Sequence, residues 1–282
     1  MGKIIAICNQ KGGTGKTTTV VNLSYALAEF NKKVLIVDTD PQGNASSGIG
    51  INKNIIEKSI YDVILDKLPT EETIIENIYP NLDLIPCNIN LTGAEIELVG
   101  ILARETRLRK ALAKLKNNYD YIIIDSPPSL GLLTLNALVA SDSIIVPIQC
   151  EFYALEGVSQ LLHIINLIKD GLNQNLVIEG VLLTMADFRT NLTTEVIKEI
   201  KNYFKDKVYK TIIPRNIKLS EAPSFGKPIM LYDHNSIGSK KYLEFAREFL
   251  GEIDNSCNIL GISELEHAQH GQVLSKQSNE GT

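Results

Sequence analysis

The feature that most constrains this chain is a glycine-rich stretch close to its start. Residues 4–8 form an apolar, largely β-branched run with the length of a buried strand. Gly12, Gly13 and Gly15 then fall within a short turn, and a helix is predicted to begin at Thr17. Glycines let the backbone point successive N–H groups at one anion, and the helix N-terminus adds the positive end of its dipole. The stretch therefore predicts a phosphate-binding loop between a strand and a helix.

The loop reads KGGTGKT at residues 11–17, which differs from the usual G-x-x-x-x-G-K-[ST] pattern. Gln10 stands where that pattern requires its first glycine, and a second lysine stands at the start of the loop. Lys16 is expected to reach the β- and γ-phosphates of a nucleotide, and the Thr17 hydroxyl to ligate Mg²⁺. A glycine-rich turn with two solvated lysines is the alternative, and the flanking strand and helix argue against it. The residues expected to contact the nucleotide are Lys11, Gly12, Gly13, Thr14, Gly15, Lys16, Thr17 and Thr18.

The composition is that of an ordinary soluble globular protein. The chain has 282 residues, of which 44% are hydrophobic and 22% charged. Its four cysteines are widely scattered without a C-x-x-C pair, which argues for a reducing compartment and against a zinc site. The first residues do not resemble a signal peptide, and the longest apolar region, residues 130–148, is interrupted by polar residues. We therefore expect a cytoplasmic protein.

Predicted strands alternate with predicted helices, which favours one doubly wound α/β domain with a mostly parallel sheet and helices on both faces. No two strands are expected to follow one another directly, and residues 45–80 give no clear pattern beyond a helical piece at 61–65. After residue 250 the composition becomes polar and acidic, with five acidic residues against one lysine and a local charge of −4. The expected domains are residues 1–250 and a disordered acidic tail at 251–282. The strands are expected at 4–8, 33–38, 82–86, 121–125, 143–148, 177–183 and 208–213, and the main helices at 20–30, 95–116, 130–140, 154–169, 194–204 and 237–250.

Carboxylates follow two of the predicted strands. Asp38 and Asp40 come at the end of the strand at 33–38, and Asp125 ends the strand at 121–125 before Ser-Pro-Pro-Ser. In a doubly wound sheet, ligands bind beyond the carboxyl ends of the strands, so these side chains should lie beside the phosphate loop. There they could hold Mg²⁺ or its waters, or orient a water that attacks the terminal phosphate. Thr17, Asp40 and Asp125 are therefore the candidate metal-site residues.

With these motifs in order, the sequence resembles the ParA-type ATPases, in particular the Soj branch of bacterial chromosome partitioning. The resemblance covers about residues 1–250 and implies that the nucleotide is ATP, bound with Mg²⁺. It implies that Asp40 is the hydrolytic aspartate and that Asp125 acts on Mg²⁺ through water. In similar proteins two subunits sandwich two ATP molecules, and the lysine at the position of Lys11 crosses into the neighbouring site. Lys11, Lys16 and Asp40 are thus the expected catalytic residues, in a dimer that forms when ATP is bound.

The resemblance implies a function for two further segments. Residues 213–216 are similar to a family segment that contacts adenine, which makes Pro214 and Asn216 candidate contacts to the base. Residues 196–220 carry seven basic residues against two acidic ones, a local charge of +5 in a chain whose net charge is −5. A solvated helical face is the plain interpretation of such a run. The Soj branch binds DNA without base specificity through residues that match Arg189 and Lys218, which favours a DNA contact here.

The resemblance also implies a partner and leaves alternatives. A ParB/Spo0J-type protein would stimulate hydrolysis and return the dimer to monomers, so the protein is expected to associate with the nucleoid and not with a membrane. A MinD-like ATPase that cycles on membranes is one alternative, although it needs a basic amphipathic C-terminal helix and the tail here is acidic. An iron-protein reductase of the nitrogenase type is a second, and its cysteine contexts are missing. Sequence does not separate a chromosomal protein from a plasmid-encoded one.

Overall fold

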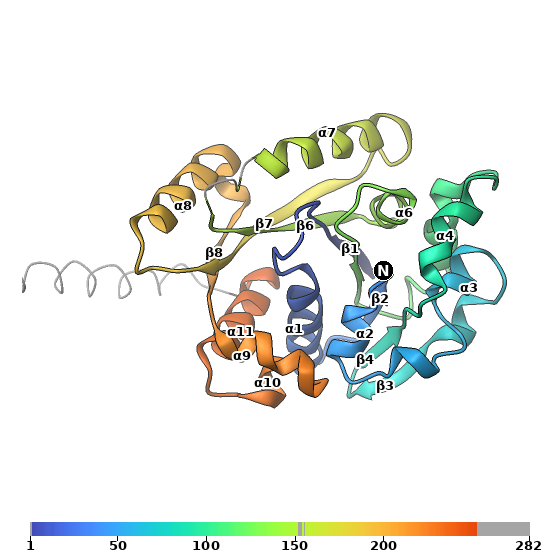
Figure 1. Ribbon diagram of the computed structural model, residues 1–282, viewed down its shortest axis with the longest axis horizontal. Coiled ribbons are helices and arrows are strands. Elements are labelled where there is room, and N and C mark those ends of the chain that lie inside the picture. Colours follow the sequence, from blue (N-terminus) through green and yellow to red (C-terminus); the bar gives the residue numbers. More distant parts are fainter. Residues whose placement is uncertain (1, 152–153, 155, 253–282) are drawn as a thin grey trace, which may run out of the picture. The chain divides into compact units, whose positions relative to one another are not determined.

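The computed structural model describes residues 2–151, 154 and 156–252, and Figure 1 shows how their helices and strands are arranged. The predicted acidic tail lies outside the described residues, apart from its first two positions. By internal contacts the chain divides into a unit of Met1–Ala246 and a second unit that begins at Arg247. The first unit contains the whole sheet and every residue predicted to take part in the site.

An eight-stranded sheet, in the order β3-β4-β2-β5-β1-β6-β7-β8, forms the centre of this unit, and every pairing except β3–β4 is parallel. Central strands such as β2 are buried along their whole length, because a parallel sheet is covered on both faces. This confirms the predicted doubly wound fold. The strands are β1 Lys3–Ile7, β2 Val34–Asp38, β3 Ile75–Tyr79, β4 Leu82–Ile85, β5 Tyr121–Asp125, β6 Ser143–Gln149, β7 Val177–Ala186 and β8 Val208–Pro214.

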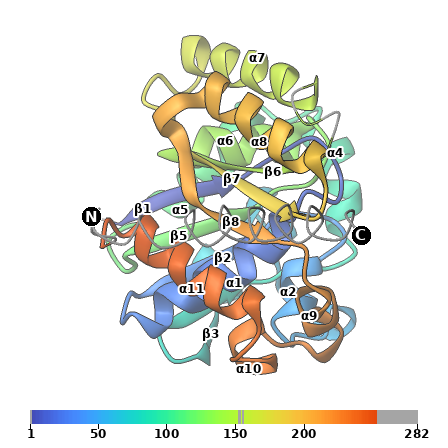
Figure 2. The same ribbon diagram turned by 90° about the vertical axis from the view of Figure 1, so that its left-hand side faces the viewer.

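Helices cover both faces of the sheet, with α6, α7 and α8 on one side and α1 on the other, where α10 packs against α1 (Figures 1 and 2). Short helices that the sequence did not predict, α2, α9 and α10, follow the carboxyl ends of β2 and β8. The helices are α1 Lys16–Glu29, α2 Asn44–Gly48, α3 Ile60–Ile64, α4 Leu91–Leu98, α5 Arg107–Ala113, α6 Leu132–Ala140, α7 Glu156–Gly171, α8 Asn191–Phe204, α9 Ile217–Glu221, α10 Ile229–Tyr232 and α11 Ile237–Phe249. Single 3₁₀ turns are η1 Lys53–Ile55, η2 Thr70–Thr73, η3 Arg104–Thr106, η4 Lys205–Lys207 and η5 Ala222–Phe225.

The prediction of one amphipathic helix over residues 95–116 was wrong. The chain leaves α4 at Leu98, passes through Ala103 in a left-handed conformation with φ of 54°, and begins α5 at Arg107. The second half of the predicted helix, which is α5, packs as expected, because Leu108 and Leu112 are fully buried. The first half does not, since Ile96, Val99 and Leu102 are 79%, 61% and 91% exposed.

The expectation that no two strands follow one another directly was also wrong. β3 and β4 form an antiparallel hairpin at the edge of the sheet, with Tyr79 opposite Leu82. Pro80 and Asn81 make the turn between them, and Asn81 has a φ of 63°. Proline followed by a left-handed asparagine is the combination that a type II turn favours.

Candidate nucleotide site

The glycine-rich loop joins β1 to α1 at the carboxyl edge of the sheet, as predicted. Gly13 and Gly15 have φ values of 75° and 86°, which L-residues with a Cβ rarely adopt. Gly15 stands immediately before α1, so the loop leads directly into the first turn of that helix. Thr184 of β7 supports the loop from one side, since its hydroxyl donates a hydrogen bond of 2.9 Å to the carbonyl of Thr14.

Lys16 lies across the loop and is only 7% exposed. Its Nζ donates a hydrogen bond of 3.1 Å to the carbonyl oxygen of Lys11. Burial lowers the pKa of the Lys16 ammonium, and the nearby carboxylate of Asp125 opposes that shift. A partly desolvated ammonium at the first turn of a helix, beside a glycine-rich loop, is suited to bind an anion such as a phosphate.

Lys11 lies apart from this arrangement, with its side chain 36% exposed. Its Nζ is 3.4 Å from Glu151 Oε2, a long contact to a carboxylate that is itself 46% exposed. Its backbone N–H donates to Asn9 Oδ1 at 3.0 Å, which fixes the start of the loop. The two lysines of the loop are therefore directed differently, with Lys16 folded over the loop and Lys11 directed to its outside.

Asp125 is a fully buried carboxylate beside Asp38. It lies at the end of β5, opposite Ile7 on one side and Asp38 on the other in the register of the sheet. Its Oδ2 accepts a hydrogen bond of 2.8 Å from the Thr17 hydroxyl, whereas its Oδ1 is buried without a hydrogen-bond partner among the described residues. Burial raises the pKa of Asp125 well above its ordinary value, and the charge of Asp38 adds to the rise.

Asp38 is held by a residue that the sequence did not single out. Its Oδ2 accepts hydrogen bonds from the backbone N–H and the hydroxyl of Ser46, at 2.8 and 2.7 Å. Burial raises the pKa of Asp38 to about 6, although these bonds from Ser46 act in the opposite direction. The contact between Asp38 and Ser46 spans eight residues and crosses the Asp40–Gly43 turn, so no local sequence motif predicts it. It ties α2 to the end of β2.

Asp40 lies on the turn between these two elements and is 6% exposed. Its Oδ1 accepts a hydrogen bond of 2.9 Å from the backbone N–H of Gln42. Gly43 closes the turn with a φ of 59°, and α2 begins at the next residue. Asp40 is therefore carried by a tight turn at the carboxyl edge of the sheet, beside the loop that bears Lys16.

The donor set fits a hard divalent cation. The Thr17 hydroxyl, Asp125 and Asp40 supply oxygen ligands, which Mg²⁺ prefers, usually through one or two carboxylates together with phosphates and waters. The unpartnered Oδ1 of Asp125 is the specific feature that a cation or one of its waters would satisfy. Burial raises the pKa of Asp38 and of Asp125, so the charged form of each carboxyl is disfavoured until an opposite charge lies beside it. The three predicted metal-site residues thus gather at one edge of the sheet.

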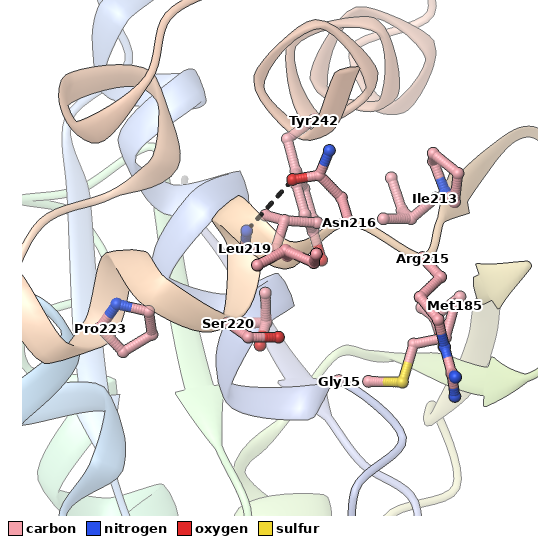
Figure 3. Close-up of a pocket in the computed structure, with 13 residues that line it drawn as sticks. Gly15, Met185, Ile213, Arg215, Asn216, Leu219, Ser220, Pro223 and Tyr242 are labelled. Carbon is pink, nitrogen blue, oxygen red and sulfur yellow. Dashed lines mark hydrogen bonds between the residues drawn. The ribbon is translucent and has the colours of Figure 1, made fainter. Parts of the chain in front are cut away.

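A pocket of about 530 Å³ opens beside the loop (Figure 3). Gly15 and Thr18 line it from the loop side, and Pro214 and Asn216 from the end of β8. The Oδ1 of Asn216 accepts a hydrogen bond of 3.3 Å from the N–H of Leu219 and so caps α9, which leaves its Nδ2 as the donor group. The predicted base contacts therefore face the same cavity as the phosphate loop.

Met185 lines this pocket as well, and sequence reasoning missed it. It has a φ of 52°, unusual for a residue other than glycine, and its side chain extends toward Gly15 (Figure 3). A left-handed residue near the end of β7 has no reliable local signature, because β-strand propensity argues for an extended backbone there.

The two predicted DNA contacts lie beyond the carboxyl ends of neighbouring strands. Arg189 follows β7 and Lys218 lies in α9 after β8. Each has an acidic partner: Arg189 donates to both oxygens of Asp187 at 2.8 and 2.6 Å, and Lys218 donates to Glu221 Oε2 at 2.9 Å. The Arg189 side chain is nevertheless 86% exposed, so its second face is open to solvent.

Comparison with known proteins gives relatives along most of the chain. Residues 2–178 match the family model described as AAA domain. The chain is 61% identical over 248 residues to the sporulation initiation inhibitor protein Soj of Bacillus subtilis, covering 88% of this chain and 98% of that protein. It is 54% identical to the chromosome partitioning protein ParA of Myxococcus xanthus, covering 89% and 88%. Among solved structures, it resembles cobyrinic acid a,c-diamide synthase of Mycobacterium smegmatis with bound ATP analogue and magnesium, at 36% identity and a TM-score of 0.78, covering 89% of this chain and 95% of that one.

Proposed function

Because the chain belongs to the ParA/Soj family of partitioning ATPases, we propose that it moves DNA by cycling between a monomer and an ATP-bound dimer. The dimer binds DNA without reading its sequence, and hydrolysis returns it to monomers. A ParB-type protein stimulates that hydrolysis. The observation that carries the proposal is the phosphate loop with two differently directed lysines, Lys11 outside and Lys16 over the loop.

The ATP chemistry follows from the groups around the loop. Backbone N–H groups of residues 12–18 and the Lys16 ammonium bind the phosphates and offset their charge. Asp40, on its tight turn, orients the attacking water, since phosphoryl transfer depends on positioning more than on a strong base. Thr17 and Asp125 would hold Mg²⁺ or its waters, and the ion would neutralise charge on the β- and γ-phosphates. Pro214 and Asn216 line the pocket beside the loop, where Pro214 would pack on the adenine ring and the Nδ2 of Asn216 would donate to its edge.

Lys11 acts across the dimer. Its contact to Glu151 is long and both side chains are about half exposed, so releasing it costs little. The freed ammonium can then reach phosphates in the neighbouring subunit, in the way that an arginine finger supplied in trans completes a site. Such a contact forms only when two subunits face each other with ATP bound, which links dimerisation to nucleotide state.

DNA binding uses Arg189 and Lys218, together with the other exposed lysines of α8 and η4. One subunit offers a small basic surface on an acidic protein, whereas a dimer offers two. Linking two weak sites raises the effective concentration of the second contact, so affinity appears when the dimer forms. Because these contacts address phosphates, they bind the nucleoid broadly and weaken with salt.

A membrane-cycling ATPase is the remaining alternative. Within the part of the chain that the structure describes, no helix is long and apolar enough to cross a membrane. The amphipathic C-terminal helix that a membrane-surface protein of this kind needs would lie outside the described residues. Pelleting with anionic liposomes in the presence of ATP distinguishes this alternative.

The test is co-sedimentation with random-sequence DNA in ADP, in ATP and in a non-hydrolysable analogue. We expect sedimentation with the analogue, a smaller fraction with ATP and the least with ADP. Size-exclusion chromatography under the same three conditions should give a dimer only with ATP or the analogue. Equal sedimentation in all three nucleotide states would overturn the proposed cycle.

A further inference from the structure

Helix α5 and its flanks carry a second concentration of positive charge. Residues 104–116 contain six basic residues and one acidic residue, a local charge of +5 within 13 residues. Residues 196–220 reach the same charge only over 25 residues. In a chain whose net charge is −5, this is a dense cationic segment that the nucleotide chemistry does not use.

The helix separates its apolar and basic sides. Leu108 and Leu112 are fully buried on one side. Arg107 and Lys110 of α5 and Lys114, its C-cap residue in helical conformation, stand at positions i, i+3 and i+7, which share the opposite side of the helix. We call these three residues the α5 basic row.

The α5 basic row lines a hollow of about 270 Å³ whose surface is mostly polar. Asp66 is the acidic residue that lines it, and its Oδ2 lies 3.2 Å from Nη1 of Arg107. The Asp66 side chain is 82% exposed, so the pair is weak and readily opened. No acidic side chain among the described residues pairs with Lys110 or Lys114. The hollow thus holds more positive charge than its own surface neutralises.

The other basic side chains of the segment are engaged in holding the fold. Arg104 bonds Glu105, Arg109 donates to the carbonyl of Leu172 at 2.9 Å, and Lys116 lies 2.6 Å from Asp142. Lys110 and Lys114 are exposed and have no acidic partner among the described residues, so they are the cations most available to an external ligand, whereas the Arg107 side chain is 22% exposed and pairs with Asp66.

We propose that the α5 basic row is a second DNA-binding surface, which holds successive phosphates of the backbone. The inference rests on the proposed function, since that function brings DNA to the protein. Cations repeated along a helix face match a ligand with repeated phosphates better than a small anion, which needs only one of them. Neighbouring positions on a helix face lie about 5–6 Å apart, and each DNA strand carries one phosphate for about every 3.4 Å of the duplex axis. Contacts of this kind position a duplex and read no bases.

The surface lies at the other edge of the sheet from the nucleotide. The segment after α5 reaches the amino end of β1, where the Lys116 carbonyl accepts a 2.8 Å hydrogen bond from Gly2. The phosphate loop follows the carboxyl end of the same strand. Figure 2 shows α5 on the side of the N-terminus, away from α2 and α9. The α5 basic row therefore contributes the same weak affinity with ADP as with ATP, whereas Arg189 and Lys218 contribute when the dimer forms.

The test compares full-length Lys110→Glu/Lys114→Glu with a matched control, Lys58→Glu/Lys240→Glu, which changes the net charge equally at exposed lysines elsewhere. Binding to random-sequence duplex is titrated with salt in ADP and in a non-hydrolysable ATP analogue. The α5 variant should weaken binding roughly 100-fold at about 50 mM salt and lower the salt slope by about 1.8 in both nucleotide states. The control should keep the slope of the wild type. Lys110→Gln/Lys114→Gln, which introduces no repulsion, should lower the slope by the same amount.

The outcomes separate this inference from the proposed function. An unchanged slope in the Lys110/Lys114 variants, beside a normal increase of binding with ATP, overturns the inference and leaves the proposed cycle standing. An equal loss in the control variant also overturns it, because net charge alone would then explain the effect. If ATP adds no affinity but the nucleotide-independent binding disappears in the Lys110/Lys114 variants, the inference stands and the proposed cycle fails.

Discussion

Asp38 and Asp125 are direct neighbours across β2 and β5, and both carboxyl groups are completely buried. Like charges so placed disfavour each other's ionisation, and burial disfavours it further. Without nucleotide the pair is therefore strained, and the loop that carries Asp40 starts from one member of it. A bound cation would offset this repulsion, so part of the free energy that the pair costs would appear as affinity for the cation.

This pair makes the stability of the nucleotide-free protein depend on pH. The pKa of Asp38 rises from 3.8 to about 6, and that of Asp125 also rises. Because the folded chain holds these protons more tightly than the unfolded chain, the free energy of unfolding falls as the pH rises from about 4 to about 6. Asp125→Asn should lessen this fall and raise the melting temperature above pH 6, by roughly 2–4 °C for each kcal/mol gained. Thermal melts of both proteins across this range test it, and a lower melting temperature in the variant would count against it.

Lys16→Ala should abolish most ATP binding while the fold survives. The ammonium is partly desolvated and its pKa is lowered, so its interaction with phosphate is expected to be strong. Losing a charged hydrogen bond of this kind costs roughly 1.5–3 kcal/mol, or about 10- to 150-fold in affinity. Titration with a fluorescent ATP analogue measures the loss, with Lys11→Ala as the control that retains binding. Unchanged affinity in Lys16→Ala would refute the phosphate-loop assignment.

Asp40→Ala should bind ATP and accumulate as a dimer, because the group that orients water is gone while the phosphate contacts remain. A positioned base of this kind typically contributes 10²- to 10⁴-fold, so turnover should fall by at least about 100-fold. Phosphate release and size-exclusion chromatography report the two effects. Asp40→Asn is the matched control, since its amide oxygen can still accept from Gln42. A monomer in the presence of ATP, or normal turnover, would disagree with this role.

Lys11→Ala should separate binding from assembly. Among the described residues, the contact of the Lys11 ammonium is the 3.4 Å approach to Glu151, so its loss should leave the fold and the ATP affinity within about twofold of the wild type. Dimerisation with a non-hydrolysable analogue should fail, and so should hydrolysis. Glu151→Gln is the informative control, because it frees Lys11 without removing it and should still dimerise. A normal dimer in Lys11→Ala would assign the ammonium to its own subunit or to solvent.

The sequence predicted the parallel strands well, because strands buried on both faces read as apolar runs with little ambiguity. The prediction from apolar spacing was wrong where the backbone conformation of a single residue interrupts a helix. The apolar spacing continues from α4 into α5 although Ala103 turns the chain, so Ile96 and Leu102 were wrongly assigned to a buried face. At the site, the loop and its carboxylates follow local motifs. Ser46 and Met185 do not, since one acts through a contact across a turn and the other through a left-handed backbone.

The proposed DNA contact of Arg189 can be tested by changing Asp187, the carboxylate that binds the Arg189 side chain. Asp187 binds Arg189 through two hydrogen bonds, which lower the pKa of that carboxyl to about 2. Arg189→Glu should abolish the gain in DNA binding that ATP brings and leave dimerisation intact, and Lys218→Glu should reduce that gain less. Asp187→Asn should act in the opposite direction, because it removes a competing negative charge and keeps the Arg189 guanidinium. Its affinity for random-sequence DNA should rise, roughly two- to tenfold at low salt, as expected for one repulsive charge near a phosphate. Co-sedimentation with a non-hydrolysable analogue measures all three variants. If Arg189→Glu dimers gain as much DNA binding with the analogue as the wild type does, and Asp187→Asn has no effect, the ATP-dependent phosphate contacts lie on another surface of the dimer.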